Sequence, residues 1–220
     1  GRSNSRFTEE KRVVFHKNMG PLISAEEMSR CIHCTRCVRF GQEVAGVMEL
    51  GMPGRGEHSE ITTFLDGAVE SELSGNMIDI CPVGALTSTS YRFKARPWDL
   101  KSTRSTCNGC SMGCSIELNS SQNKMLRILG VDNDSVNQGW LCDKGRYNFE
   151  YLNSEKRLKT PQKSINNNFV DVEIQDVYSE LSEIIQDRKT KVNFLLGSNL
   201  ANEDYVAFRE FSKSISDTEQ

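Results

Sequence analysis

Residues 31–40 read CIHCTRCVRF and place three cysteines within seven positions. The spacing Cys-x-x-Cys-x-x-Cys is typical of ferredoxin-type sites, in which one tight loop supplies three thiolates to an iron–sulfur cluster. Three thiols seldom complete a metal site, so a fourth ligand is expected elsewhere in the chain. Cys81 meets this expectation, because Pro82 follows it and a Cys-Pro pair is part of the same signature.

A second group of cysteines repeats this plan. Residues 107–114 read CNGCSMGC, and one further cysteine follows at 142, so all eight cysteines fall into two groups of three plus one. Disulfide pairing gives no reason for that arrangement, and a Cys-x-x-Cys pair closes too small a loop to bridge easily. The candidate ligands are Cys31, Cys34, Cys37 and Cys81 for the first set, and Cys107, Cys110, Cys114 and Cys142 for the second set.

The thiols alone do not identify the metal, because zinc also binds thiolates. Structural zinc ribbons combine two Cys-x-x-Cys pairs, whereas each set here has three cysteines together and one far away. A cubane cluster is larger than a single ion and accepts three thiolates from one loop and a fourth from a remote segment. We therefore predict a [4Fe-4S] cluster at each set. A zinc-stabilised structural module without a redox role remains the alternative.

Cationic residues beside the cysteines are candidates for tuning the clusters. A positive charge near a cluster raises its reduction potential by stabilising the added electron. Each of these side chains is as readily explained as a solvated surface charge. The strongest candidates are Arg36, Arg39 and Lys144, with Arg30 and Arg146 beside them.

The three histidines are not expected to be ligands. Four cysteines already complete a cubane, so His33 inside the first triplet is predicted to be a neighbour only. His16 and His58 have no cysteine or carboxylate constellation around them and are predicted to lie at the surface.

Composition excludes several other functions. The chain has 220 residues, a net charge of −3 and 37% apolar residues, so no basic field points to nucleic acid. No apolar run approaches the roughly 20 residues that span a bilayer. No nucleophile elbow, phosphate loop or paired-carboxylate motif stands out, so no catalytic residue is predicted. The chain begins with Gly1 and no signal peptide is visible, which leads us to expect a fragment.

Short elements are expected around the first set of cysteines. Ser24 and Glu27 have the spacing of a capping box and predict a short helix from about Ala25. A helix of two to three turns is expected after Cys37 and should end at Gly46. Further expectations are strands at 46–50 and 60–65 around a long turn, a helical segment at 71–80 that leads into Cys81, and a connector at 94–106.

The second half of the chain predicts a hairpin and then an α/β arrangement. The alternating runs at 114–118 and 124–129 indicate two paired strands. Apolar residues at helical spacing predict helices at 173–187 and 202–215, with a buried-type strand at 191–197 between them. Helix, strand and helix form the start of a layered α/β domain with too few strands for a sheet.

Several motifs together resemble one known family. Residues 5–100 look like the largest iron–sulfur subunit of respiratory NADH:quinone oxidoreductase, complex I, which is called the G subunit in bacteria. Residues 107–150 resemble the iron–sulfur domain that opens molybdopterin oxidoreductases, and the region after 158 is similar to the α/β domain that follows it. The motifs are SRFTEEKR at 5–12, KNMGPL at 17–22, RCIHCTRCVRF at 30–40, SELSGNMIDICPVGALTS at 71–88, ARPWDL at 95–100, CNGCSMGC at 107–114 and GWLCDKGRYNFEYLN at 139–153.

The resemblance implies a fold class and domain boundaries. It implies α+β iron–sulfur domains: a ferredoxin-like cluster segment at 1–100 and a small 4Fe-4S domain with a β-hairpin at 101–157. A truncated molybdopterin-oxidoreductase-like α/β domain would occupy 158–220. A [2Fe-2S] cluster and a further [4Fe-4S] cluster would lie upstream in the full-length protein.

The resemblance also implies a function and partners. The first cluster would lie on the main electron path from the flavin in the NADH-binding subunit toward quinone, through downstream ferredoxin-type subunits. The second cluster would lie off that path, and its presence favours a bacterial source. The complex would place this region at the cytoplasmic face of the bacterial inner membrane, or on the matrix side in mitochondria. No nucleic acid is expected to bind, and the membrane is reached only through the complex.

Two departures and one alternative qualify the resemblance. His16 stands where an acidic residue is expected, and TSTSYRF at 87–93 differs from the usual Lys-Pro, but neither touches a proposed ligand. Lys144 matches a residue that lies near the pterin in molybdenum enzymes, yet no molybdenum is predicted. The relay part of an NAD-linked hydrogenase or a molybdenum formate dehydrogenase is the runner-up, although the long gap from Cys37 to Cys81 favours complex I.

Overall fold

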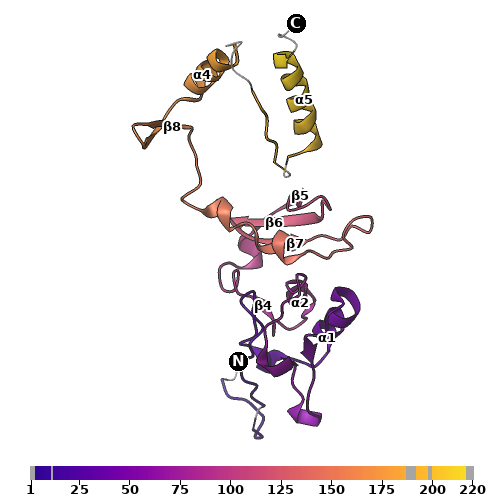
Figure 1. Cartoon of the computed structure of the whole chain (residues 1–220). Helices are drawn as coiled ribbons and strands as arrows, with labels where there is room; N and C mark the ends of the chain where they lie inside the picture. The colour runs from indigo at the N-terminus through magenta and orange to yellow at the C-terminus, as the bar shows by residue number, and fades with distance from the viewer. Residues whose placement is uncertain (1–2, 11, 187–191, 198–199, 217–220) are drawn as a thin grey trace. The chain divides into compact units, whose positions relative to one another are not determined.

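The chain folds as two compact units, Gly1–Glu150 and Tyr151–Gln220. The computed structural model describes residues 3–10, 12–186, 192–197 and 200–216. Figure 1 shows the order of the elements along the chain. Both predicted sets of cysteines lie in the first unit.

The N-terminal part of the first unit is built from short paired strands and short helices. Strand β1 (Ile23–Ser24) pairs antiparallel with β4 (Thr87–Ser88), which brings the chain before the first triplet close to the chain after Cys81. Strands β2 (Leu50–Gly51) and β3 (Thr62–Thr63) form a second antiparallel pair. The predicted strand pair is therefore confirmed, although each strand has only two residues.

Two helices carry cysteines of the first set. Helix α1 (Arg36–Phe40) continues into a π-helical turn, η2 (Gly41–Ala45), and ends at Gly46, whose φ of 72° suits a glycine. Helix α2 (Asn76–Ile80) ends directly at Cys81. Both predicted helices are confirmed, whereas the π-helical turn had no signal in the sequence.

The helix predicted from Ala25 is wrong. Ser24, the expected N-cap, lies in strand β1 and pairs with Thr87, and Ala25 forms a bridge to Lys17. These residues are therefore extended and do not begin a helix. Only a single 3₁₀ turn, η1 (Met28–Arg30), precedes the first triplet. Burial of Ile23 and Ala25 in the core explains why the extended conformation overrides the local helix signal.

A core of apolar side chains supports the first set. Three of its cysteines, Cys31, Cys37 and Cys81, are partly buried and pack against this core. The apolar surroundings fix the loops that carry the cysteines. The buried core members are Val14, Met19, Ile23, Ala25, Met28, Phe40, Leu50, Ile61, Val69, Met77, Ala85 and Leu86.

The second part of this unit is a three-stranded antiparallel sheet followed by a short helix. Strands β5 (Lys101–Thr106), β6 (Ser115–Ser121) and β7 (Lys124–Gly130) lie in that order, as Figure 1 shows. The predicted hairpin corresponds to β6 and β7 and turns at Gln122 and Asn123, which both have positive φ. Helix α3 (Asp143–Tyr147) begins directly after Cys142.

The connector predicted at 94–106 is wrong over its last six residues. Strand β5 pairs with β6 from Lys101↔Ser120 to Thr106↔Ser115. The sequence KSTRST contains no apolar residue, so it lacks the alternation that would predict a strand, and all six side chains of β5 are exposed. Backbone pairing at the sheet edge holds it in place.

The second unit contains a hairpin and two helices. Strands β8 (Gln162–Ile165) and β9 (Asn168–Asp171) pair around Asn166 and Asn167, which both have positive φ. Helices α4 (Ile174–Gln186) and α5 (Asn202–Ser216) confirm the two helix predictions, of which the last residue of the first, Asp187, lies outside the described residues. The hairpin was not predicted.

The strand predicted at 191–197 is wrong where the structure describes it. Lys191 lies outside the described residues, and residues 192–197 form no strand. The ring of Phe194 instead packs against Phe208 and Phe211 of α5, at centroid distances of 6.2 and 5.7 Å. A strand needs a neighbour to pair its backbone, and apolar packing on the helix takes its place here.

Single 3₁₀ turns connect the longer elements. They are η3 (Gly56–His58), η4 (Phe64–Asp66), η5 (Pro97–Asp99) and η6 (Glu150–Asn153).

Candidate metal centres

The four cysteines of the first set line a single pocket. Cys31, Cys34, Cys37 and Cys81 face it together with apolar side chains that include Met28, Ile61 and Leu86. The structure therefore brings the remote cysteine to the triplet. A pocket that offers four thiols among apolar neighbours has the donor set that an iron–sulfur cluster uses.

Unusual backbone geometry shapes the triplet loop. His33 and Thr35 flank Cys34, and both have positive φ, 54° and 58°. This conformation is uncommon for residues other than glycine and is a genuine outlier for a β-branched residue such as threonine. The two left-handed residues curl the chain around Cys34 before α1 begins at Arg36. The strain lies in the loop that presents the thiols.

Burial and mutual repulsion act on the thiols of the first set. Burial is the main cause that raises the pKa of Cys37 to about 11, and the neighbouring Cys31, Cys34 and Cys81 contribute to that rise. Four thiolates gathered here would repel one another without a cation between them. Because metal ligands must be deprotonated, a bound metal centre would supply the positive charge that the thiolates need.

In the second set, Cys107 and Cys114 pack against the same apolar cluster. Burial raises the pKa of Cys114, and the charges of Cys107, Cys142 and Cys110 add to that rise. The amide of Cys107 donates a 2.8 Å hydrogen bond to the carbonyl of Cys114, which fixes the ends of this triplet loop. Cys110, at the centre of the loop, is exposed, whereas the other three cysteines of the set are partly buried.

Backbone amides point at two of the second-set sulfurs. The N–H of Gly109 donates to Sγ of Cys107, and the N–H of Gly145 donates to Sγ of Cys142, each at 3.4 Å. Hydrogen bonds to ligand sulfurs stabilise the reduced cluster and raise its potential. Apart from the glycines that permit close approach, no pattern in the sequence marks these donors.

The predicted cationic neighbours divide into two kinds. Arg36 is exposed and lines the first pocket, while Arg39 and Lys144 are exposed on their helices. Arg30 lies 3.7 Å from the carboxylate of Glu27. Arg146 differs from all of them because only 5% of it is exposed.

The three histidines lie in different surroundings. His16 and His58 are exposed, as the sequence predicted. Nε2 of His33 lies 2.9 Å from Nη1 of Arg12, and Arg12 also donates to the carbonyl of Ser59. No group of three or more His, Cys, Asp or Glu side chains among the described residues is arranged to hold a single metal ion.

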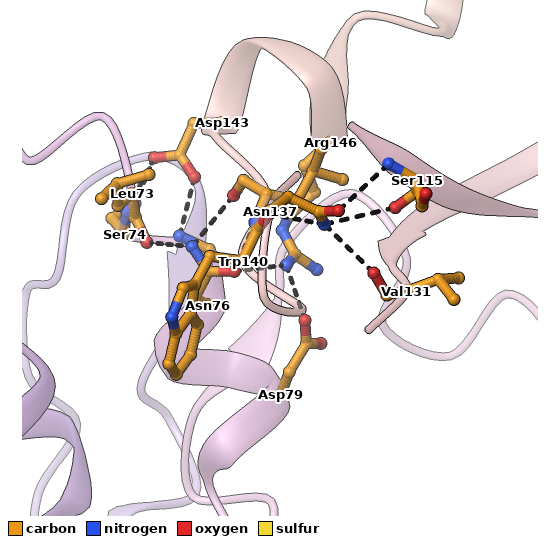
Figure 2. Close-up of polar contacts among 12 residues, drawn as sticks. Leu73, Ser74, Asn76, Asp79, Ser115, Val131, Asn137, Trp140, Asp143 and Arg146 are labelled. Atoms are coloured by element: carbon orange, nitrogen blue, oxygen red, sulfur yellow. Dashed lines mark hydrogen bonds and ion pairs between the residues drawn. The ribbon is translucent and has the colours of Figure 1, made fainter. Parts of the chain in front are cut away.

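Sequence reasoning missed the polar residues that shape the second site. Asn137 is the centre of one group: its Nδ2 donates to the carbonyls of Val131 (3.1 Å) and Trp140 (3.0 Å), and its Oδ1 accepts from the amide of Ser115 (3.2 Å). Figure 2 shows these contacts. They tie the loop that leads to Cys142 to strand β6 and to Val131, the residue after β7. Asparagine in a polar loop is common, so its pattern alone predicts no such role.

A substitution at Gly145 is expected to damage the second site. A Cβ at this position would lie 2.8 Å from Cδ1 of Leu141 and 3.2 Å from Sγ of Cys107. Leu141 is 1% exposed and has little room to move. We expect Gly145→Ala to lower stability by about 1–3 kcal/mol and to reduce the second-set cluster signal in electron paramagnetic resonance (EPR).

Gly51→Ala is the matched control, because a Cβ there meets no atom within 4 Å. It should leave both cluster signals unchanged. A Gly145→Ala protein with a full second-set signal would show that this close packing does not matter to the site.

Two family models match the chain, and each matched range contains one complete set of cysteines. The model described as NADH-quinone oxidoreductase subunit 3, ferredoxin-like domain, matches residues 20–87. The model described as molybdopterin oxidoreductase Fe4S4 domain matches residues 100–154. The first range contains helices α1 and α2, and the second contains strands β5 to β7 and helix α3.

Longer proteins that are similar to this chain carry related names. The chain is 42% identical over 199 residues, 90% of its length, to the NADH-quinone oxidoreductase G subunit of Rickettsia typhi. It is 40% identical over 212 residues, 96% of its length, to the NADH-ubiquinone oxidoreductase 75 kDa subunit of Reclinomonas americana. The chain belongs to the family of NADH-quinone oxidoreductase G subunits and 75 kDa subunits.

A plant protein is similar to this chain as well. The chain is 44% identical over 190 residues, 86% of its length, to the mitochondrial NADH dehydrogenase [ubiquinone] iron-sulfur protein 1 of Solanum tuberosum. The chain spans 29%, 30% and 26% of the lengths of the three relatives. Among the described residues, no helix is both long enough and apolar enough to cross a membrane.

Proposed function

We propose that this chain is the part of a 75 kDa-type subunit that relays electrons within NADH:quinone oxidoreductase. The observation that carries the proposal is the gathering of the first-set thiols, Cys31, Cys34, Cys37 and Cys81, around one pocket inside the matched ferredoxin-like range. An iron–sulfur relay needs a donor set and no general base. The plant relative is named an iron-sulfur protein, which fits this arrangement.

Two [4Fe-4S] clusters form the relay in this proposal. The first set holds one, and Cys107, Cys110, Cys114 and Cys142 hold the other. The match of residues 100–154 to an Fe4S4 domain supports the second assignment. When bound, each cluster accepts and donates one electron, while the protein supplies the thiolates, the apolar surroundings and the amide donors at Gly109 and Gly145.

The charges around the two sites set their potentials in this proposal. Arg36 lies at the first pocket and Lys144 follows the second-set ligand Cys142, so both favour the reduced cluster. Arg39 is exposed one turn from Arg36 and adds to the same field.

In this proposal, the first cluster lies on the main path that carries electrons from the flavin to quinone. Its partners in this proposal are the other subunits of the complex, notably the flavin and NADH-binding subunit and the downstream ferredoxin-type subunits. The second cluster lies off that path. The region then sits in the peripheral arm, at the cytoplasmic face of a bacterial inner membrane or on the matrix side in mitochondria, and reaches the membrane through the complex.

Residues 158–220 form the start of an α/β domain of the molybdopterin-oxidoreductase type in this proposal, after cluster domains at 1–100 and 101–157. Helix α4 supports it, because its apolar residues are exposed within the described part of the chain: Ile174, Tyr178, Leu181 and Ile184 are 40%, 63%, 47% and 45% exposed. Such a stripe requires further packing partners.

The relay is tested by reduction with NADH in the assembled complex. A freeze-quenched sample should show the EPR signal of the first-set cluster within the turnover time. The same signal should be missing from a complex that carries Cys31→Ser. If the first-set cluster stays oxidised with NADH but is reduced by dithionite, it does not lie on the path from the flavin.

A further inference from the structure

A turn that follows a second-set ligand contacts the helix that leads to a first-set ligand. We call residues 140–146 the cross-segment turn; it contains Cys142 and the start of α3. One carboxylate oxygen of Asp143 accepts from the amide of Ser74 (3.1 Å) and its hydroxyl (2.6 Å), and the other accepts from the amide of Gly75 (2.7 Å). Figure 2 shows Asp143 above Ser74. Asp143 therefore pairs the amide of Gly75, the residue before α2, and shares the amide of Ser74 with the carbonyl of Ser71.

A second contact is made by Asn76, the first residue of α2. Nδ2 of Asn76 donates to the carbonyl of Leu141 (2.9 Å), and the amide of Leu141 donates to Oδ1 of Asn76 (3.0 Å). Both residues are 1% exposed. Asn76 thus pairs both backbone groups of the residue that precedes Cys142.

An ion pair completes the connection near the far end of α2. Nη2 of Arg146 lies 2.6 Å from Oδ2 of Asp79 and 3.2 Å from Oδ1 of Asn76. Only 5% of the Arg146 side chain is exposed, against 39% for Asp79. A Cβ on Gly75 would lie 2.5 Å from Cδ of Arg146, so a glycine leaves the space that the arginine fills.

The cross-segment turn also touches the helix that follows the first triplet. The ring of Trp140 packs against Phe40 of α1 at a centroid distance of 5.0 Å. Trp140 is partly buried against the core of the first set. One short turn therefore contacts both helices that flank the first pocket.

We infer that Asp143 and Arg146 are positioning residues for the first cluster, although they follow a ligand of the second. They act through α2, whose last residue, Ile80, precedes Cys81. Asp79, the partner of Arg146, lies two residues before that ligand. The inference rests on the proposed function, because it concerns the geometry of a cluster at the first set.

The unequal burial of the ion pair predicts an order of effects. Asp79→Ala leaves a buried guanidinium without its carboxylate, which is the costly case. Arg146→Met leaves a carboxylate that solvent already reaches, so its effect should be smaller. The double variant, Asp79→Ala with Arg146→Met, removes both charges. Its effect should be smaller than that of Asp79→Ala alone, because the effects of substituting two paired residues do not add.

The test uses the full-length protein in its assembled complex, prepared anaerobically. The g values and intensity of each cluster are recorded by EPR, with Cys31→Ser and Cys107→Ser to assign the two signals. Amide exchange at Asn76, Met77 and Ile78, which are hydrogen-bonded in α2, reports on the helix itself. Lys124→Met is the control: it removes one exposed positive charge at the turn of the β6–β7 hairpin.

We expect Asp79→Ala to speed exchange at these amides roughly 100-fold and Arg146→Met roughly tenfold. Both should shift the g values of the first cluster, while the Lys124→Met protein keeps them. Asp79→Asn, which retains an acceptor oxygen, should lie between wild type and Asp79→Ala.

Unchanged first-cluster g values in Asp79→Ala would overturn the inference, and so would equal loss of both signals, which indicates general destabilisation. A wild-type protein with no cubane signal at either set would instead overturn the proposed function. The wild-type spectrum therefore separates the two failures.

Discussion

Cys81→Ser is expected to abolish the first cluster and leave the second. Cys81 is the remote member of its set and reaches the triplet from the end of α2. Loss of one of four thiolates opens the site on the side of Pro82, and serine is a poor ligand for iron in such a cluster. Iron and acid-labile sulfide should fall by about four atoms each per first-set site. Of the two signals assigned to these sets, EPR of the reduced protein should then show only the second.

Cys107→Ser is the matched variant, since it removes one ligand of the other set and should leave only the first signal. All eight cysteines of residues 1–220 belong to the two sets, so no further cysteine in this range can replace the lost ligand. Two intact cubanes in the Cys81→Ser protein would show that the ligands are grouped wrongly.

Asn76→Ala is expected to give the largest loss of stability among substitutions away from the ligands. The side chain makes four polar contacts, with the carbonyl of Leu73, both backbone groups of Leu141 and Nη2 of Arg146. Alanine would leave the buried backbone of Leu141 unpaired, at a cost of about 1–3 kcal/mol for each unsatisfied group. We expect the free energy of unfolding to fall by about 3 kcal/mol or more, measured from the urea midpoint under anaerobic conditions.

Asn148→Ala serves as the control, because Asn148 is exposed at the end of α3. Its free energy of unfolding should stay within about 0.5 kcal/mol of wild type. Equal urea midpoints for the two variants would mean that the Asn76 contacts contribute nothing beyond those of a surface amide.

The candidate ligand sets could be predicted from sequence because thiol spacing is a one-dimensional signal. Two Cys-x-x-Cys pairs that share a cysteine, and a Cys-Pro pair far away, indicate the chemistry before any fold is known. The helices around Cys37 and before Cys81 were predicted for a similar reason, since the residue patterns that indicate them are local. Helices α4 and α5 belong to the same group, because each has a long amphipathic pattern.

The parts that sequence did not predict depend on contacts between distant residues. Asn76 and Leu141 are 65 positions apart, and nothing local marks either as a partner of the other. Strand β5 pairs through its backbone and has exposed polar side chains, of which Ser102 also accepts from Nδ2 of Asn119. Ser24 and Glu27 have the spacing of a capping box, yet Ser24 lies in a strand because it pairs with Thr87.

Arg146 shows how such a contact changes an interpretation. Its position after Cys142 suggested a cation beside the second cluster. The structure turns its guanidinium toward Asp79 and Asn76 of the first segment, where it is buried. The carboxylate of Asp79 therefore neutralises most of the charge that Arg146 would otherwise place beside the second cluster. We assign Arg146 a role in positioning α2 instead.

The central claim is that both thiol sets hold [4Fe-4S] clusters. Metal and sulfide analysis of anaerobically purified full-length protein, combined with EPR after dithionite reduction, tests it most directly. The account predicts two distinct cubane signals that depend on cysteines of residues 1–220, one lost in Cys31→Ser and the other in Cys107→Ser. Two equivalents of zinc, no sulfide assigned to these sets and no cubane signal that depends on Cys31 or Cys107 would contradict it.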